Sequence, residues 1–380
     1  MFLRLHVIVV TLSFEVVEKG RGLHRVYAVS EGRRVSWLTI LDLYFHYGES
    51  RIRVGGVAGV YTPREFRRRG YSRATIEYAL KWMEENGYPL TALFGIQEYY
   101  HKFGYATFMG EHVATITLRD ASRAVRGEGY EVVLTDDPGY RSREIAELYE
   151  ENNRSRIASR VREPGEWRGF RKGVSWEHEP KVLALEHGCI VGYAALERWP
   201  SPEELVVAEV GAVEHDYRVY ESLLAELYET ALSSRKSVLK FYLPPDHPMI
   251  EVLIAHGCRV ESTYPWSGGG MARVVGLREM FEEILPELEP RSRGIEGSLE
   301  VRVPGERVVL KVSDGSVELL ESGESSNVVE LDQGLLAQLV LGYRSLGEAS
   351  SKISFKGSGA RILHGLFRKA APYVWQPDRW

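Results

Sequence analysis

The chain has 380 residues, of which 44% are hydrophobic and 27% charged, a composition typical of a globular protein with two or three domains. The formal net charge of −5 excludes a global positive field of the kind that holds DNA or RNA. No run approaches the roughly 18 apolar residues of a membrane span, so we expect a cytoplasmic protein with neither a nucleic-acid nor a membrane partner.

The apolar start of the chain, residues 1–14, has the hydrophobicity of a signal peptide. It contains no small-residue cleavage site and runs directly into Glu15 and Glu18. We interpret this segment as a strand or as a truncated start.

A first unit is expected over residues 1–125. Apolar residues recur at helical spacing over 71–85, and Asn86-Gly87 is a natural end for that helix. A short helix or turn is predicted over 97–105. The predicted strands are 24–31, 33–48, 52–62, 90–96 and 112–118. Strand–helix–strand alternation indicates an α/β (α+β) fold, with a mixed sheet flanked by helices.

Two further units follow. Residues 126–288 repeat the order of helix, hairpin, strand, helix and strand, which indicates a divergent duplication of the first unit. Residues 289–380 begin with strands separated by turns, and Asp332 is a candidate N-cap for the helix that follows. A closing helix is predicted over 361–375.

The two cysteines each stand in a His-Gly-Cys tripeptide, at 187–189 and 256–258. One interpretation is a metal site with two histidines and two cysteines. The other places the first tripeptide in a hairpin turn and the second at a helix end, with Gly257 as the C-cap. We favour the second interpretation, with reduced thiols and no metal.

The stretch RRRGYS, residues 67–72, concentrates positive charge at the start of the helix predicted over 71–85. A helix N-terminus has unpaired amides and a positive dipole end, and both suit an anion such as a pyrophosphate. Arginine side chains would add charge from the flanks. The alternative is a solvated arginine run with Gly70 in a turn.

The arginine run follows a strand and is itself followed, about 30 residues on, by YYHKFGY. This combination resembles the GNAT superfamily of acyl-CoA N-acyltransferases, whose motif aligns with Arg67, Gly70 and Ser72, the serine replacing a glycine or alanine. The order of a GNAT unit, a second GNAT-like unit and a unit similar to sterol carrier proteins, seen in VVELDQGLLAQLVLGYRSLGEA, resembles the Eis (enhanced intracellular survival) acetyltransferases.

The resemblance implies acetyl-CoA as co-substrate and a set of site residues. The pantetheine arm would run along Val60, Tyr61 and Thr62. The pyrophosphate would lie on Arg67, Arg68, Arg69, Gly70, Tyr71, Ser72 and Arg73. Gly95 and Ile96 would flank the thioester. Tyr100 would be the general acid, and the carboxylate of Trp380 the general base.

These roles are chemically reasonable, because a phenol with a pKa near 10 is protonated at neutral pH and can supply a proton to the leaving thiolate. Tyr99 and Glu98 are alternative candidates for the position of Tyr100 in the site. The last residues could instead be a loose tail with Trp380 on the surface. In the second unit, Glu214 and Asp216 stand where the phosphates would bind, so we expect a scaffold there.

The predicted function is transfer of an acetyl group to a primary amine, which would be a polyamine, an aminoglycoside-like amine or a lysine. The alternatives are a lipid-binding protein and a catalytically inactive scaffold. The resemblance also implies a homo-oligomer, a hexamer. The family usually carries two helices before the strand at 24–31, so we expect a more open acceptor pocket or a missing start.

Overall fold

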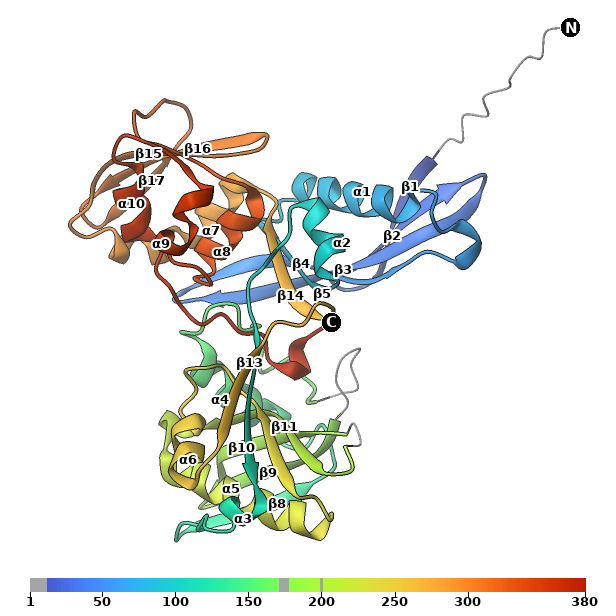
Figure 1. The fold of residues 1–380 in the computed structure, drawn as a ribbon, viewed down its shortest axis with the longest axis vertical. Helices are drawn as coiled ribbons and strands as arrows, with labels where there is room; N and C mark the ends of the chain where they lie inside the picture. The colour runs from blue at the N-terminus through green and yellow to red at the C-terminus, as the bar shows by residue number, and fades with distance from the viewer. Residues whose placement is uncertain (1–11, 171–177, 199–200) are drawn as a thin grey trace, which may run out of the picture.

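The computed structural model describes residues 12–170, 178–198 and 201–380. Three mixed β-sheets with helices packed on them form the molecule, which confirms the predicted fold class. In Figure 1 the first and third sheets form one body, and the second sheet forms another body below them.

The first sheet has the order β1-β2-β3-β4-β5-β14-β6. Its strands are β1 (Leu12–Gly20), β2 (Leu23–Ser30), β3 (Arg33–Tyr47), β4 (Ser50–Tyr61), β5 (Leu90–Gly95), β14 (Gly269–Val274) and β6 (Ala106–Thr107). Helix α1 (Tyr71–Glu85) has the predicted bounds, and Ile76, Ala79 and Met83 bury its apolar stripe against this sheet. The short helix α2 (Gln97–Tyr100) follows β5.

The second sheet has the order β13-β7-β12-β11-β10-β9-β8. Its strands are β13 (Arg259–Thr263), β7 (Glu111–Thr117), β12 (Val238–Tyr242), β11 (Glu204–Ala212), β10 (Cys189–Glu197), β9 (His178–Glu186) and β8 (Tyr130–Thr135). Its helices are α3 (Leu118–Ala121), α4 (Ser142–Asn153), α5 (Tyr217–Ser233) and α6 (Met249–His256).

The first two sheets exchange strands. The strand predicted over 112–118 as the last of the first unit is instead β7, which pairs antiparallel with β12 and β13 of the second sheet. In return β14 pairs with β5 and β6 of the first sheet. A strand pattern carries no information about its pairing partner, which is why that assignment was wrong. The boundaries at 125/126 and 288/289 stay predictions.

The third sheet has the order β17-β16-β15-β18-β19. Its strands are β17 (Ser316–Leu320), β16 (Glu306–Ser313), β15 (Glu296–Val303), β18 (Val328–Glu330) and β19 (Ser354–Lys356). The helices in this part of the chain are α7 (Leu277–Arg291), α8 (Gln333–Val340), α9 (Leu346–Ala349) and α10 (Gly359–Leu366). Asp332 caps α8, since its Oδ1 accepts from the Leu335 amide at 2.6 Å, as predicted.

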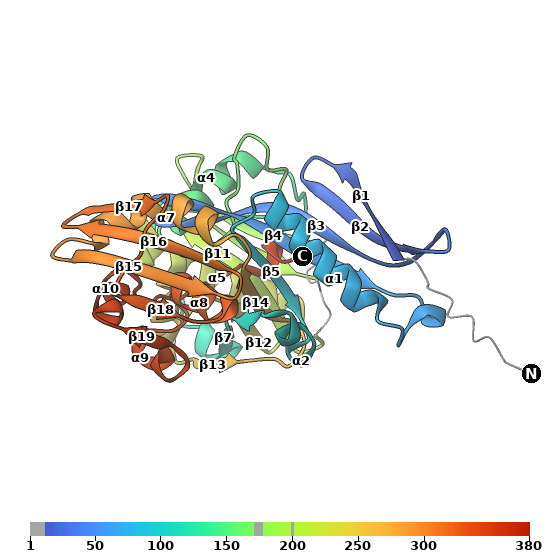
Figure 2. The ribbon, with the colours of Figure 1, turned by 90° about the horizontal axis from the view of Figure 1, so that it is seen from above.

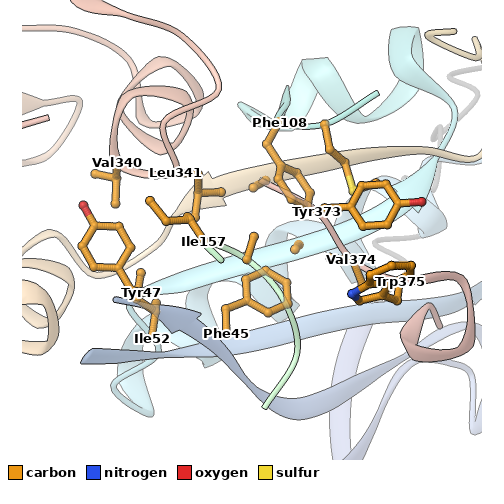
Figure 3. Close-up of a cluster of buried hydrophobic side chains, with 14 of the residues drawn as sticks. Phe45, Tyr47, Ile52, Phe108, Ile157, Val340, Leu341, Tyr373, Val374 and Trp375 are labelled. Atoms are coloured by element: carbon orange, nitrogen blue, oxygen red, sulfur yellow. The ribbon is translucent and has the colours of Figure 1, made fainter. Parts of the chain in front are cut away.

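The closing helix predicted over 361–375 is wrong beyond Leu366. The chain leaves the helix at Phe367 (φ −113°, ψ 116°) and runs between the units as an extended tail. Figure 3 shows Tyr373, Val374 and Trp375 of this tail in one cluster with Phe45 of β3 and Ile157. The apolar residues read as a helical stripe are therefore buried by tertiary contacts.

Figures 1 and 2 both place the end of the chain beside β5, at one end of the first sheet. Throughout the described segments, no helix combines the length and apolarity that a bilayer crossing requires.

Candidate active site

The parallel strands β4 and β5 separate at one end. Their pairing stops at Val57 and Leu93, although β4 continues to Tyr61 and β5 to Gly95. A bulge helps to turn β4 away, because Trp37 and Thr39 of β3 pair with Tyr61 and Ala58, which leaves one extra residue in β4. The open end leaves a strand edge to which an extended ligand could add.

The N-terminus of α1 follows β4 after a short 3-10 turn, Arg64–Phe66, and its features suit an anion. Gly70 caps it with φ +82°, and Arg68 also has a left-handed backbone at φ +62°, which is strained for a residue with a side chain. In the part of the chain that the structure describes, the amides of Tyr71, Ser72 and Arg73 have no acceptor. The first turn contains no acidic residue.

The predicted arginines surround this helix end in different ways. Arg68 and Arg69 are exposed beside Gly70. Arg67 turns back, and its Nε donates to the Thr62 carbonyl at 3.0 Å. Arg73 is exposed and pairs with Glu77 at 2.8 Å. Among the described residues, the guanidinium groups of Arg68 and Arg69 and the three amides thus have no partner, an arrangement that suits an anion.

The residues predicted to follow the pantetheine arm line the open end. Val60 is half-buried and Tyr61 is 47% exposed, both on β4 past its last pair with β5. Thr62 Oγ1 donates to Ser36 Oγ at 2.9 Å. Across the gap, Gly95 ends β5 and Ile96 is 39% exposed.

Tyr100 approaches the open end from the face of the sheet that carries α1. A Cβ built on Gly95 would lie 2.4 Å from its ring, so the glycine is needed for this contact. The ring packs against the cluster that contains Leu93 and Ile76. Burial and the neighbouring Tyr99 raise the pKa of Tyr100 to about 12, which keeps the phenol protonated.

Trp380 lies on the opposite face of the same sheet. The centroid of its indole lies 5.3 Å from that of the Phe94 ring and 6.3 Å from that of the Phe45 ring. A Cβ built on Gly56 would lie 2.8 Å from the indole. Because Leu93 and Phe94 are neighbours on β5, their side chains point to opposite faces. At 8% exposure Trp380 is buried, so the tail is not loose and its tryptophan does not lie on the surface.

The alternatives to Tyr100 have other contacts. Tyr99 OH shares a 2.6 Å hydrogen bond with Ser72 Oγ, which links α2 to the first turn of α1. Glu98 is exposed. Tyr99 therefore supports the first turn of α1, whereas the Tyr100 ring packs on Gly95 at the end of β5.

The second unit contains the matching helix, α5, after a strand that pairs in parallel with its neighbour, β11 with β12. Here Asp216 is the N-cap, and its Oδ1 accepts from the Arg218 amide at 2.8 Å. Glu214 stands two residues before it. A helix start that is already capped by a carboxylate is unsuited to a phosphate.

An aromatic row on the Trp380 face did not emerge from the sequence. Tyr27, Trp37 and Tyr61 lie side by side across β2, β3 and β4, with centroids 6.3 and 4.9 Å apart. The guanidinium of Arg34 already lies 3.9 Å from the Tyr27 ring. Trp37 lies on the same face of β3 as Leu43 and Phe45, because every second residue of a strand points to one face. The position of Trp37 was therefore readable from the sequence once β3 was assigned.

The two His-Gly-Cys tripeptides and the third unit lie apart from this strand pair. His187 and Gly188 form the β9–β10 turn and Gly257 ends α6, as predicted, and across the described residues no group of three metal-ligand side chains gathers. A cavity of about 1170 Å³ lies in the third unit. Charged residues and apolar residues both line it, namely Arg302, Glu306, Arg307, Glu330 and Lys352 together with Val303, Pro304, Leu331 and Ile353.

The sheets and the open strand pair β4 and β5 define a GNAT-like fold. Residues 14–108 match the family model described as an acetyltransferase (GNAT) domain. Among curated proteins, none matches this sequence.

Solved structures resemble nearly the whole chain at low identity. A GCN5-related N-acetyltransferase from Anabaena variabilis has a TM-score of 0.74 at 18% identity, covering 94% of this chain and 90% of its own. A probable N-acyltransferase from Enterococcus faecalis has a TM-score of 0.77 at 16% identity, covering 95% of this chain and 90% of its own. Eis1 from Mycobacterium abscessus has a TM-score of 0.66 at 17% identity, covering 94% of this chain and 91% of its own. At these identities the likeness shows a shared fold.

A charge placed at the N-terminus of α1 tests the anion site. We expect Gly70→Asp to weaken acetyl-CoA binding about tenfold or more, because a carboxylate would repel the diphosphate; aspartate tolerates the left-handed backbone better than most residues. Titration calorimetry measures the affinity.

The matched control is Gly87→Asp, at the other end of the same helix. Gly87 also has a left-handed backbone (φ +70°) and open space around it. The affinity of Gly87→Asp for acetyl-CoA should stay within about twofold of the wild type. Equal weakening in both variants would contradict an anion site at Gly70.

Proposed function

We propose that the protein is an acetyl-CoA-dependent N-acetyltransferase of the Eis type that acts on primary amines. The observation that carries this proposal is that Tyr100 and Trp380 reach the open end of β4 and β5 from opposite faces. The anion-binding turn of α1 lies beside that end. A thioester in the gap could thus meet an acid on one side and an amine on the other.

The residues divide the chemistry between them. The amine nitrogen attacks the thioester carbonyl carbon, so a C–N bond forms and the C–S bond breaks. Tyr100 OH gives its proton to the leaving sulfur, which departs as free coenzyme A. The proton lost by the amine goes to the carboxylate of Trp380, directly or through water, and the phenolate of Tyr100 is reprotonated from solvent.

The acceptor is proposed to be a cation. The aromatic row Tyr27, Trp37 and Tyr61 lies further along the face that carries Trp380, and aromatic faces attract ammonium groups. A polyamine, an aminoglycoside-like amine or a lysine side chain has this chemistry. Assembly into a homo-oligomer stays a prediction.

Release of free thiol from acetyl-CoA tests the function. We expect release that depends on an added amine from a panel of polyamines, aminoglycosides and lysine peptides, and a mass gain of one acetyl group on the amine. Silence across the panel together with no binding of acetyl-CoA would contradict the proposal.

A further inference from the structure

One arginine, Arg162, is buried between the second unit and the tail. Its side chain is 2% exposed, and the carboxylates beside it, Glu209 and Asp378, are 0% and 4% exposed. Glu209 belongs to β11, whereas Asp378 ends the short 3-10 turn η5 (Gln376–Asp378), two residues before Trp380. The arginine therefore connects the second sheet to the end of the chain.

The guanidinium of Arg162 divides its donors between the two carboxylates. Nη1 and Nη2 donate to Oε1 and Oε2 of Glu209 at 2.7 and 2.6 Å. Nε and Nη2 donate to Oδ1 and Oδ2 of Asp378 at 3.1 and 2.9 Å. Two bidentate pairs on one planar fork fix the orientation of both carboxylates, which a lysine ammonium cannot do.

Aromatic side chains complete the cluster. The centroid of the Tyr149 ring lies 3.8 Å from the guanidinium carbon of Arg162. The hydroxyl of Tyr149 shares its hydrogen between the Arg160 carbonyl at 2.9 Å and Asp378 Oδ2 at 3.0 Å. Tyr193 OH donates to Glu209 Oε1 at 2.7 Å. The side chain of Asp378 is thus held by three donors, all supplied by the second unit.

Other contacts hold the tail on either side of Asp378. Trp375 Nε1 donates to Asn153 Oδ1 at 2.8 Å, and Arg379 pairs with Glu111 of β7 at 2.5 Å. Asp378 is the single acidic residue in 367–380. Buried ion pairs seldom stabilise a core more than apolar packing does, whereas their directional bonds select one geometry.

We propose that Arg162 is a positioning residue for acyl transfer, which fixes Asp378 and through it the carboxylate of Trp380 at the open end of β4 and β5. This inference rests on the proposed function. It also gives the second unit a role, because the unit that has a carboxylate at the start of α5 supplies the anchor for the base.

Two readouts on Arg162→Lys test the inference. We expect kcat to fall roughly a hundredfold while the KM for acetyl-CoA stays within about twofold, because a displacement near 1 Å has an effect of that size. We also expect carboxypeptidase to remove the released tail, which intact-mass spectrometry measures. In the wild type the buried end should resist digestion.

Three further variants separate this role from general packing. Arg141→Lys is the control, because Arg141 contacts Glu144 and the Gly188 carbonyl away from the tail, and both readouts should stay at wild-type values. Asp378→Asn should reproduce Arg162→Lys. Glu209→Gln leaves the pair of Arg162 with Asp378 intact, so its tail should stay protected.

Several outcomes would overturn the inference. One is a protected tail with unchanged kcat in both Arg162→Lys and Asp378→Asn. Another is a tail released as readily in Glu209→Gln, which would make the cluster ordinary core. If circular dichroism shows Arg162→Lys to be unfolded, Asp378→Asn decides. Absence of both turnover and acetyl-CoA binding in the wild type would refute the proposed function and with it the role of Arg162 in acyl transfer, whereas carboxypeptidase protection would still decide whether Arg162 anchors the tail.

Discussion

Replacing Tyr100 by phenylalanine is expected to lower kcat by about 100-fold or more, with the affinity for acetyl-CoA within about twofold of the wild type. The substitution removes the proton that the leaving thiolate needs, but keeps the ring that packs on Gly95. Stopped-flow or steady-state thiol release gives kcat, and calorimetry gives the affinity. Unchanged turnover would place the acid elsewhere.

The neighbouring tyrosine offers a matched control. Tyr99→Phe loses the hydrogen bond to Ser72, so it should weaken acetyl-CoA binding slightly and leave kcat within about tenfold. The pH profile adds a second check on Tyr100. Because burial raises its pKa to about 12, the acid form persists in alkali, and kcat should not decline through ionisation of Tyr100 below about pH 10.

Extending the chain past Trp380 by two glycines is expected to reduce kcat about 100-fold. The extension moves the terminal carboxylate away from the open strand end, and the buried indole leaves little room for added residues. The same thiol-release measurement gives kcat, and thermal unfolding shows whether the fold persists.

The control inserts the same two glycines between Asp314 and Gly315, in the turn between β16 and β17. That turn belongs to the third sheet and bonds to Ser292 and Gly294, whereas Trp380 packs on the first sheet, so kcat should stay near the wild-type value. Full activity in the extended chain would refute a role for the terminal carboxylate.

Local features were predictable from the sequence where the physics is local. Helix α1 follows from apolar spacing and from Asn86-Gly87, and both of its bounds were predicted. The arginines next to a glycine at the start of that helix were also readable, whereas the anion site that they indicate stays a prediction. Asp332 was readable as an N-cap because capping depends on three neighbouring residues.

Features that depend on distant partners were not predictable. Arg162 and Asp378 lie 216 positions apart, and nothing near either residue marks them as partners. The helix predicted over 361–375 forms as far as Leu366, and its second half failed for the same reason, because apolar residues at helical spacing can equally be buried by tertiary contacts. The roles of Tyr100 and Trp380 came from the family resemblance and stay predictions.

The exchange of β7 and β14 has a consequence for how the protein is made. Gly95 and its strand β5 leave the ribosome about 170 residues before β14, the strand that covers their edge. Until Val274 has emerged, the nascent first sheet carries an uncovered edge of the kind that invites wrong pairing. The first sheet can therefore be completed only when nearly three quarters of the polypeptide has been synthesised.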